Sequence, residues 1–279
     1  MTEKLPERIG DYRLIREIGR GAFGIVYEAI QESLQRRVAL KVLPAELFPD
    51  ASILKRFKQE AQAAAQLNHP NIVTVHEAGQ DGEFYYFSME YVEGKSLAQE
   101  LAERGGSALP SELEETDFTE SIEAVHGKKT QPSIDSAKKA PSLPRLPNRR
   151  ECYEIAAKLA EVADGLDYAH QQGIVHQDIK PSNLMINRIG RLCIVDFGTA
   201  QIKRLRDDPE LTGGIATPLY ASPEQLGITP EPVGPPSDIW SLGTTLYEWL
   251  TLTPPFPATD YKTLVDQIAK KEPLPPREA

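Results

Sequence analysis

The first third of the chain consists largely of short segments in which apolar and polar residues alternate, a pattern typical of β-strands. A segment rich in Ala, Lys, Gln and Glu at residues 51–67 interrupts this series and predicts a helix. The first part of the chain is therefore expected to be β-rich, with one helix. The predicted strands cover residues 12–18, 25–29, 37–43, 73–79 and 84–89.

Beyond residue 150, apolar residues recur mainly at the spacing of an α-helix. The first helical segment ends at Gly173, since glycine commonly terminates helices. A proline-rich break at residues 254–257 separates the last two. The predicted helices cover residues 152–173, 238–252 and 261–271, and two short strands are predicted at 184–187 and 192–195.

Residues 105–150 follow neither pattern, being rich in Ser, Pro, Lys and Glu with little apolar periodicity. Residues 112–123 carry six acids and no base, whereas residues 128–150 carry seven bases and one acid. We predict a mostly disordered insertion here, which acts either as a solvated spacer or as a docking or self-regulatory segment.

The composition narrows the class of protein. With 40% hydrophobic and 26% charged residues among 279, the chain is typical of a soluble globular protein. Its net charge of −10 argues against nucleic acid or an anionic membrane as the main partner. Only Cys152 and Cys193 are present, which favours a reducing compartment over a disulfide framework. No apolar run approaches the roughly 20 residues that span a bilayer, so a cytoplasmic location is predicted.

Three glycines, Gly19, Gly21 and Gly24, lie between the first two predicted strands. This spacing is weak evidence alone, because it also occurs in dinucleotide-binding folds and in plain hairpin turns. A strand, rather than a helix, follows Gly24, which argues against the dinucleotide-binding fold. Glycines in such a turn let backbone amides approach phosphate groups closely.

A second set of polar residues indicates more specific chemistry. Asp178 and Asn183 lie five residues apart in a short polar loop, and Asp196 ends the next apolar segment. Their oxygen atoms are suited to holding Mg²⁺ and to orienting a hydroxyl group. Lys41 lies inside an apolar strand, where an unpaired charge is costly, so it requires a partner.

Taken in order, these segments closely resemble the eukaryotic-type (Hanks-type) protein kinases, and bacterial serine/threonine kinases in particular. The resemblance covers residues 12–271 apart from the insertion. It implies an α+β fold with a small β-rich N-lobe at residues 12–91 and a larger helical C-lobe at 92–279, truncated at its C-terminal end. The motifs that carry it are the glycine segment, Val-Ala-Leu-Lys at 38–41, His-Gln-Asp at 176–178, Asp-Phe-Gly at 196–198 and Ser-Pro-Glu at 222–224.

The resemblance implies transfer of the ATP γ-phosphoryl group to Ser or Thr hydroxyls of protein substrates, with Mg²⁺ as cofactor. In that mechanism Asp178 orients the hydroxyl and takes its proton, while Lys180 lies beside the transferred phosphate. Asn183 and Asp196 are the implied Mg²⁺ ligands. Thr217, in the substrate loop, is implied to bridge Asp178 and Lys180.

The same resemblance implies the nucleotide site. Lys41, paired with Glu60, is expected to hold the phosphates. Met89 is expected to gate the pocket behind adenine, whose edge bonds to the Glu90 carbonyl and the Val92 amide. The other residues implied to bind the nucleotide are Ile18, Gly19, Gly21, Gly24, Val26, Ala39 and Leu184.

Two departures from the family pattern leave alternatives open. Gln177 replaces an arginine that binds a phosphate on the activation segment in most members, and no arginine candidate is evident as a partner of Glu224. A catalytically inactive scaffold is therefore the alternative to an enzyme, whereas Ser-Pro-Glu argues against a small-molecule phosphotransferase. Thr212 is the natural phosphorylation site, but the neutral Gln177 predicts a small effect of its phosphorylation. Control by homodimerisation or by the insertion is expected instead.

Overall fold

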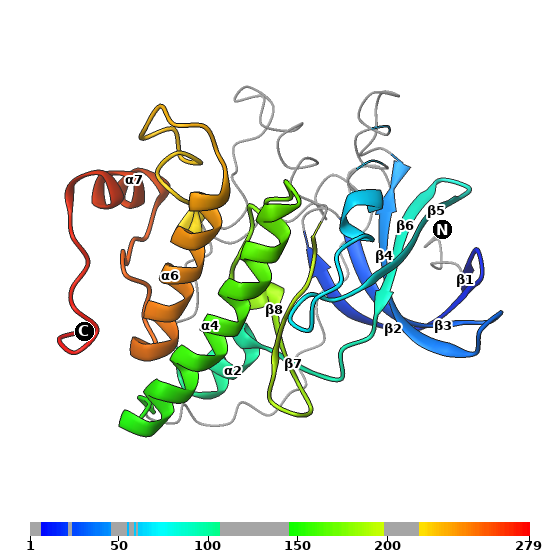
Figure 1. Ribbon diagram of the computed structural model, residues 1–279, viewed down its shortest axis with the longest axis horizontal. Helices are drawn as coiled ribbons and strands as arrows, with labels where there is room; N and C mark the ends of the chain where they lie inside the picture. The colour runs from blue at the N-terminus through cyan, green and yellow to red at the C-terminus, as the bar shows by residue number, and fades with distance from the viewer. Residues whose placement is uncertain are drawn as a thin grey trace, which may run out of the picture.

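The structure is a computed structural model that describes a β-rich part and a helical part at opposite ends of the molecule's long axis (Figure 1). Within the described residues, no helix is long and apolar enough to cross a membrane. The described residues are 7–21, 24–45, 55, 59, 61–106, 145–197 and 218–279.

The β-rich part is a six-stranded sheet in the order β1-β2-β3-β4-β6-β5, and every neighbouring pair is antiparallel. The five strands predicted in this region are present, with ends extended by up to three residues or shortened by up to two, and a short additional strand, β1, precedes them. The strands are β1 (Arg8–Ile9), β2 (Tyr12–Gly21), β3 (Gly24–Gln31), β4 (Arg36–Pro44), β5 (Val75–Asp81) and β6 (Phe84–Glu90).

Strand β4 is buried on both faces, because successive side chains point to opposite sides of a sheet. Val38 and Leu40 belong to one apolar cluster, whereas Ala39 and Leu43 belong to the other. Lys41 shares the alternation of Ala39 and Leu43, which places its side chain on the same side of the sheet. The strand therefore carries Lys41 between two apolar residues on this face.

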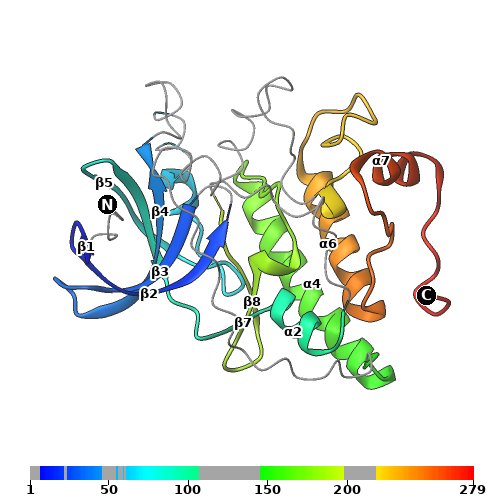
Figure 2. The ribbon, with the colours of Figure 1, turned by 180° about the vertical axis from the view of Figure 1, so that it is seen from behind.

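The helical part contains a small three-stranded sheet, β7-β8-β9, and four described α-helices. Helices α4 and α6 run side by side in both ribbon views, and both contribute buried apolar side chains to the core of this part (Figures 1 and 2). The elements are β7 (Gly94–Ser96), α2 (Leu97–Glu103), α4 (Arg149–Gln171), η3 (Pro181–Asn183), β8 (Leu184–Asn187), β9 (Leu192–Ile194), η4 (Pro218–Tyr220), α6 (Pro235–Thr251) and α7 (Tyr261–Lys270).

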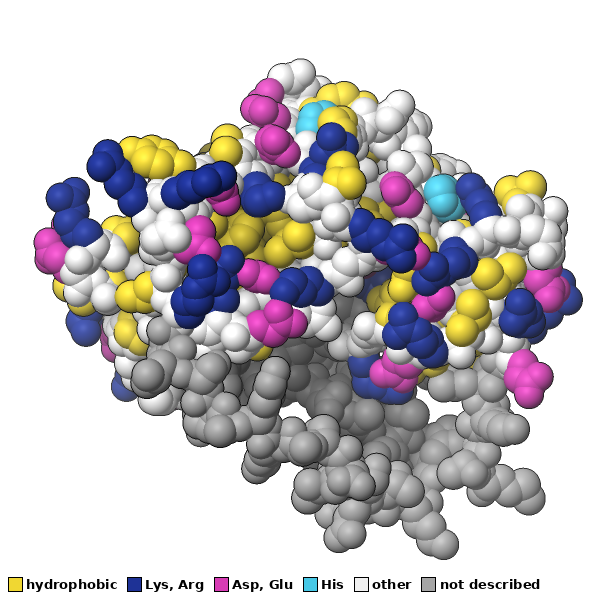
Figure 3. Space-filling view, turned by 90° about the horizontal axis from the view of Figure 1, so that it is seen from below, with side chains coloured by type: hydrophobic (Ala, Val, Ile, Leu, Met, Phe, Trp, Pro, Cys, Tyr) yellow, Lys and Arg dark blue, Asp and Glu magenta, His cyan; other side chains and the backbone are white. Residues whose placement is uncertain are grey.

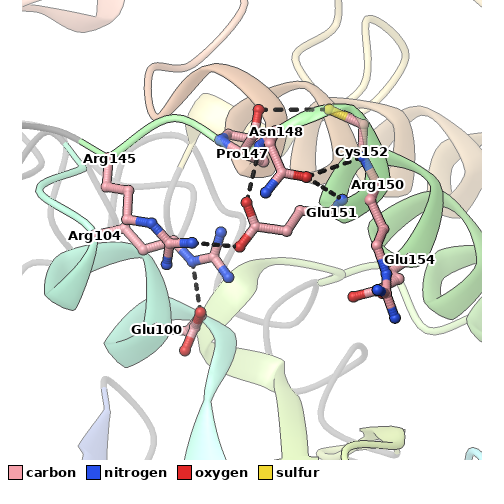
Figure 4. A network of polar contacts seen from close by, with 9 residues as sticks. All are labelled: Glu100, Arg104, Arg145, Pro147, Asn148, Arg150, Glu151, Cys152 and Glu154. Carbon is pink, nitrogen blue, oxygen red and sulfur yellow. Dashed lines mark hydrogen bonds and ion pairs between the residues drawn. The ribbon is translucent and has the colours of Figure 1, made fainter.

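Helix α4 begins three residues earlier than predicted (Figure 4). The Asn148 side chain accepts hydrogen bonds from the amides of Arg150 (3.0 Å) and Glu151 (3.1 Å). Glu151 in turn accepts from the Asn148 amide at 2.8 Å, which completes a capping box. The predicted insertion through Arg150 is therefore too long, since Arg149 and Arg150 belong to the helix. Helix α6 also starts early, at Pro235, a residue suited to a first helical turn.

The two described residues that flank positions 107–144 lie close together. The Arg145 amide donates to the Arg104 carbonyl at 2.9 Å, and the Arg104 side chain pairs with Glu100 on α2 (Figure 4). Arg145 also pairs with Glu151 on α4 at 2.7 Å. The chain thus leaves and re-enters the helical part at one place, as an insertion would, while the predicted disorder of the insertion lies largely outside the described residues.

The surface seen from below mixes both signs of charge, with Lys and Arg side chains lying among Asp and Glu (Figure 3). Exposed ion pairs such as Arg150 with Glu154 (3.0 Å) and Lys270 with Asp266 (2.6 Å) occur on the helices. Pairs of this kind contribute little to stability, so the fold rests on burial and on the buried polar contacts.

Several sets of contacts join the β-rich part to the helical part. In the first, the Ile194 amide donates to the Asn71 carbonyl (2.7 Å) and the Val73 amide donates to the Ile194 carbonyl (3.0 Å). The buried Asn71 side chain adds a bond to the Leu192 carbonyl at 2.8 Å. In the second, Glu93 pairs with a basic side chain of each part.

Glu93 lies in the segment between β6 and β7, where the chain passes from one part to the other. Its carboxylate pairs with Arg37 of β4 at 2.6 Å and with Arg188, after β8, at 2.6 Å. Arg37 also pairs with Glu28 and lies over the ring of Tyr91 at 4.3 Å. These contacts tie the connecting segment to both parts of the molecule.

We expect Asn71→Ala to lower the free energy of unfolding by about 1–3 kcal/mol, because the substitution removes a buried hydrogen bond between the two parts. Urea unfolding monitored by fluorescence measures this change. Asn68→Ala, at an exposed position three residues away, is the matched control and should change stability by less than about 0.5 kcal/mol. Equal effects of the two substitutions would contradict the role given to Asn71.

Candidate active site

A pocket of about 430 Å³ lies between the sheet and the helical part. Its walls come from β2, β3, β4 and β6 on one side and from the η3 region and the end of β9 on the other. The predicted residues that line it are Ile18, Gly19, Gly21, Gly24, Val26, Ala39, Lys41, Met89, Glu90, Val92, Asp178, Lys180, Asn183 and Asp196.

Leu184 was predicted to line this pocket, and this prediction is wrong. Leu184 is fully buried in the core of the helical part, whereas Met185 lines the pocket. Both residues lie on β8, where neighbouring side chains point to opposite faces, so a shift of one position changes the assignment. Sequence reasoning also missed Tyr91, Ser96, Gln99 and Val195, which line the pocket as well.

Three predicted residues, Glu60, Thr212 and Thr217, lie outside the described residues. The expected pairing of Lys41 with Glu60 and the expected bridge from Thr217 therefore stay predictions. The structure shows another partner for Lys41, namely Asp196, at 2.8 Å between Nζ and Oδ2.

The Lys41–Asp196 pair joins β4 to the segment after β9, across the two parts of the molecule. Lys41 is largely buried and the Asp196 side chain is 22% exposed. Burial alone would raise the pKa of Asp196, but the charge and hydrogen bond of Lys41 outweigh it and lower that pKa. The charged form of the Asp196 carboxylate is thus favoured, and the Lys41 and Asp196 side chains face the same pocket.

Asp178 and Asn183 come together because the chain between them folds into the short 3₁₀ turn η3. Asn183 Nδ2 donates to the Asp178 carbonyl at 2.8 Å and to its carboxylate at 2.9 Å. Lys180 Nζ lies 3.4 Å from the same carboxylate. The Asn183 carbonyl accepts from the Val195 amide at 3.0 Å, one residue before Asp196. The turn thus brings the side chains of Asp178, Lys180 and Asn183 together, next to the segment that carries Asp196.

A buried carboxylate supports this loop from behind. Asp238, on the first turn of α6, is fully buried and accepts from the backbone amides of His176 (2.8 Å) and Gln177 (2.6 Å). Its Oδ2 also lies 2.7 Å from Nε2 of His170 on α4.

His176 connects the loop to the segment that carries Asp196. Its Nδ1 accepts from the Asp178 amide at 3.2 Å, which leaves Nε2–H to donate to the Val195 carbonyl at 2.9 Å. The imidazole also packs edge-on against Phe197, with ring centroids 4.6 Å apart. Asp178 and Asp196 are therefore held in a fixed relation through one buried histidine.

The residues fit Mg²⁺ as part of a shared coordination sphere. Asn183 uses Nδ2 toward Asp178, which leaves its Oδ1 as the oxygen that would coordinate a metal, and Asn183 and Asp196 line the same pocket. No cluster of three His, Cys, Asp or Glu side chains suited to a metal occurs within the described ranges. One or two oxygen ligands from the protein are enough for Mg²⁺, because the ion takes its remaining ligands from water and phosphate.

Gly24, in the glycine turn between β2 and β3, lines the pocket and also packs closely against β4. Gly24 has φ of +150°, and a Cβ built there would lie 2.1 Å from the Val42 carbonyl oxygen of β4. Any side chain at this position would have to displace the neighbouring strand. Glycine at position 24 is thus required by the sheet itself, whatever it does for a ligand.

The segment after residue 217 is fixed on helix α6. The Tyr220 hydroxyl donates to the buried Glu248 carboxylate at 2.6 Å, and Ser241 Oγ donates to the Tyr220 carbonyl at 2.7 Å. Burial raises the pKa of Glu248, although the Tyr220 bond opposes the shift. These contacts hold the segment within reach of the loop that carries Asp178.

Glu224 has a partner that sequence reasoning missed. Ser237 Oγ, fully buried on α6, donates to Glu224 Oε1 at 2.5 Å. Burial alone would raise the pKa of Glu224, but this hydrogen bond helps to lower it overall. The hydroxyl thus satisfies a carboxylate for which the resemblance implied an arginine.

Comparison with known proteins identifies the family of this arrangement. The family model described as "Protein tyrosine and serine/threonine kinase" matches residues 12–279. A probable serine/threonine-protein kinase of Streptomyces coelicolor is 35% identical over 97% of this chain and 35% of its own length. The serine/threonine-protein kinase PknB of Mycolicibacterium smegmatis is 33% identical over 97% of this chain and 37% of its own.

The fold agrees with these matches. The PknI kinase domain of Mycobacterium tuberculosis superposes with a TM-score of 0.60 at 25% identity, covering 88% of this chain and 75% of that domain. The predicted two-lobed fold is thereby confirmed. The chain spans about a third of the length of the curated relatives it matches, namely 35% and 37% of the two above.

We expect Asp238→Asn to destabilise the chain by about 3 kcal/mol. The amides of His176 and Gln177 each bond to a different carboxylate oxygen of Asp238, whereas an asparagine side chain offers only one acceptor oxygen. Its NH₂ group would also face a backbone amide or His170. Urea unfolding measures the loss. Asp266→Asn, at an exposed position on α7, should be neutral. A neutral result at Asp238 as well would contradict the role given to its carboxylate.

The Lys41–Asp196 pair gives a prediction for acid unfolding. Because the folded-state pKa of Asp196 is depressed, the pairing stabilises the fold above the unfolded-state pKa of aspartate, about 4, and this contribution disappears as pH falls through the lower folded value. Lys41→Met should therefore lower stability at neutral pH by about 1–3 kcal/mol and reduce the loss between about pH 5 and pH 3.

Urea titrations of the wild type and Lys41→Met at four pH values test this expectation. Lys262→Met, at an exposed position on α7, serves as the control for loss of one positive charge. Parallel pH curves for the wild type and Lys41→Met would show that the pair contributes nothing to the pH dependence.

Proposed function

Because this chain belongs to the protein tyrosine and serine/threonine kinase family, we propose that it transfers the γ-phosphoryl group of ATP to serine or threonine hydroxyls of proteins. The observation that carries the proposal is the convergence of Lys41, Asp178, Lys180, Asn183 and Asp196 on one pocket. Relatives named serine/threonine-protein kinases support this choice of acceptor.

The part of the pocket lined by the sheet and the segment after β6 is proposed to bind the adenine of the nucleotide. Val26, Ala39 and Met185 supply apolar surface for the adenine ring, and Met89 lies at the back, paired with Ala39 across β4 and β6. The Glu90 carbonyl and the Val92 amide are the backbone groups proposed to bond the adenine edge. The ring would thus be recognised mainly by shape, with backbone groups fixing its orientation.

The phosphates would lie toward Lys41 and the glycine turn. Protein kinases generally use ATP with Mg²⁺, and Asn183 and Asp196 are the residues proposed to hold the ion. When bound, Mg²⁺ neutralises phosphate charge and orients the phosphate chain. Lys41 contributes a second positive charge from the sheet side of the pocket.

The chemistry on the acceptor side falls to Asp178 and Lys180. Asp178 would accept a hydrogen bond from the substrate hydroxyl and take its proton as the hydroxyl oxygen bonds to the γ-phosphorus. The bond between the γ-phosphorus and the bridging oxygen breaks, and ADP leaves with that oxygen. Lys180, 3.4 Å from the Asp178 carboxylate, would stabilise the negative charge on the transferred group.

The partners proposed for this site are protein substrates, and a homodimer stays a prediction. Both cysteines among the described residues, Cys152 and Cys193, are free thiols. A cytoplasmic location is proposed because that compartment keeps thiols reduced and supplies ATP.

Incubation of the chain with Mg²⁺ and labelled ATP, with and without a generic basic protein, tests the proposal. Transfer to serine or threonine, identified by phosphoamino-acid analysis, is the expected result. Nucleotide binding without any transfer, at enzyme concentrations in the micromolar range, would instead identify a scaffold.

We expect Asp178→Asn to lower kcat by about 10²–10⁴ with little change in ATP affinity, because Asp178 is assigned to the acceptor. Asp196→Asn should lower both kcat and the affinity for Mg²⁺-ATP, because it removes a proposed ligand. Initial rates and nucleotide titrations separate the two patterns.

The control for these substitutions is Asp167→Asn, at an exposed position on α4 whose side chain bonds only to Gln171 in the described contacts. It should leave both quantities within about twofold of the wild type. An Asp178→Asn variant with wild-type turnover would exclude the assignment of this loop.

A further inference from the structure

Gln177, the residue before Asp178, has an uncommon backbone conformation. Gln177 has φ of +62°, in the left-handed region that non-glycine residues rarely occupy. A strained residue of this kind persists only where its surroundings hold it. The carbonyl of Gln177 and the amide of Asp178 belong to one planar peptide unit. A contact that fixes this carbonyl therefore also fixes the orientation of the Asp178 backbone.

Two groups hold Gln177, one on each side. Its amide donates to Asp238 Oδ1 at 2.6 Å, and its carbonyl accepts from Gln225 Nε2 at 2.9 Å. Asp238 lies on helix α6, whereas Gln225 follows the Ser-Pro-Glu segment at residues 222–224. The strained residue is therefore clamped between the core helix and the segment expected to receive the substrate.

The side-chain amide of Gln225 is matched to its surroundings at both ends. Its Oε1 accepts from the Ser222 amide at 2.9 Å and from Ser222 Oγ at 3.2 Å, while its Nε2 donates to Gln177. The reversed orientation would set oxygen against the Gln177 carbonyl and NH₂ against the Ser222 amide. The hydrogen bonds thus determine the orientation of the side chain and require a glutamine of this length.

We propose that Gln225 is a positioning residue that aligns Asp178 with the acceptor hydroxyl by locking the Gln177–Asp178 peptide unit to the segment at Ser222. The proposal rests on the phosphoryl transfer proposed above. Gln225 is not among the residues that line the pocket assigned to the nucleotide. Its effect should therefore appear in turnover and not in nucleotide binding.

Gln225→Glu is the sharpest test, because it keeps the size of the side chain and the acceptor for Ser222 but removes the donor to Gln177. A carboxylate oxygen would face the Gln177 carbonyl oxygen and repel it. We expect kcat to fall by about tenfold or more, since a small misplacement of a reacting group is costly in rate. The KM for ATP should stay within about twofold of the wild type.

Gln225→Leu removes both the donor and the acceptor and provides the second variant. The matched control is position 267 on α7, also half-buried, where Gln267 Nε2 donates to the Pro257 carbonyl at 2.8 Å. Gln267→Glu and Gln267→Leu lose the same kind of hydrogen bond away from the pocket. Both should retain wild-type kcat and KM. The comparison separates the general effect of losing a glutamine hydrogen bond from the specific effect of losing the bond to Gln177.

Amide hydrogen exchange followed by NMR on the 279-residue chain gives a readout that needs no activity. In Gln225→Glu the Gln177 and Asp178 amides should exchange about tenfold faster or more, while the Ser222 amide, which keeps its acceptor, should be unchanged. In Gln225→Leu all three amides should exchange faster. The Gln267 variants should leave all three unchanged.

The outcomes distinguish this inference from the proposed function. If the wild type transfers phosphate and Gln225→Glu keeps kcat within about twofold, the positioning role is overturned while the function stands. If the wild type transfers nothing, the function fails, and unchanged exchange at Gln177 and Asp178 would overturn the clamp as well. A loss of kcat accompanied by an equal loss of ATP affinity or by a general fall in melting temperature would show a structural role only.

Discussion

The carboxylate of Asp238 is the interaction on which the arrangement of the site depends. It is fully buried at the start of α6, and it binds two successive backbone amides of the loop that carries Asp178. A buried charge is costly unless donors surround it, so this carboxylate and the loop backbone hold each other in place. The His170 ring extends the contact to α4, which makes the loop part of the helical core.

From this anchor the site is built outward through polar contacts between segments distant in the sequence. His176 links the loop to the segment of Asp196, and Lys41 reaches Asp196 from the sheet. The bonds between residues 71–73 and β9 bring the two parts of the molecule together beside the pocket. Because each part contributes one side of the Lys41–Asp196 pair, the approach of the two parts directly sets the geometry available to a nucleotide.

Two neutral side chains bind polar groups near the loop that carries Asp178. Ser237 donates to Glu224, and Gln225 holds the carbonyl of Gln177, the residue that replaces an arginine of the family pattern. Neutral donors avoid the cost of burying an unpaired cation. The hydrogen bond from Gln225 to Gln177 thus ties the loop that carries Asp178 to the segment after residue 217.

The sequence by itself determined the strands, the long helices and the identity of most pocket residues, because alternation, helical spacing and ordered motifs are local properties. It placed Leu184 in the pocket instead of Met185, since one residue of register on β8 reverses the face. It also could not provide Ser237 for Glu224 or Gln225 for Gln177. Those hydrogen bonds join residues 13 and 48 positions apart, and only the packing of α6 against the catalytic loop decides which donors meet which acceptors.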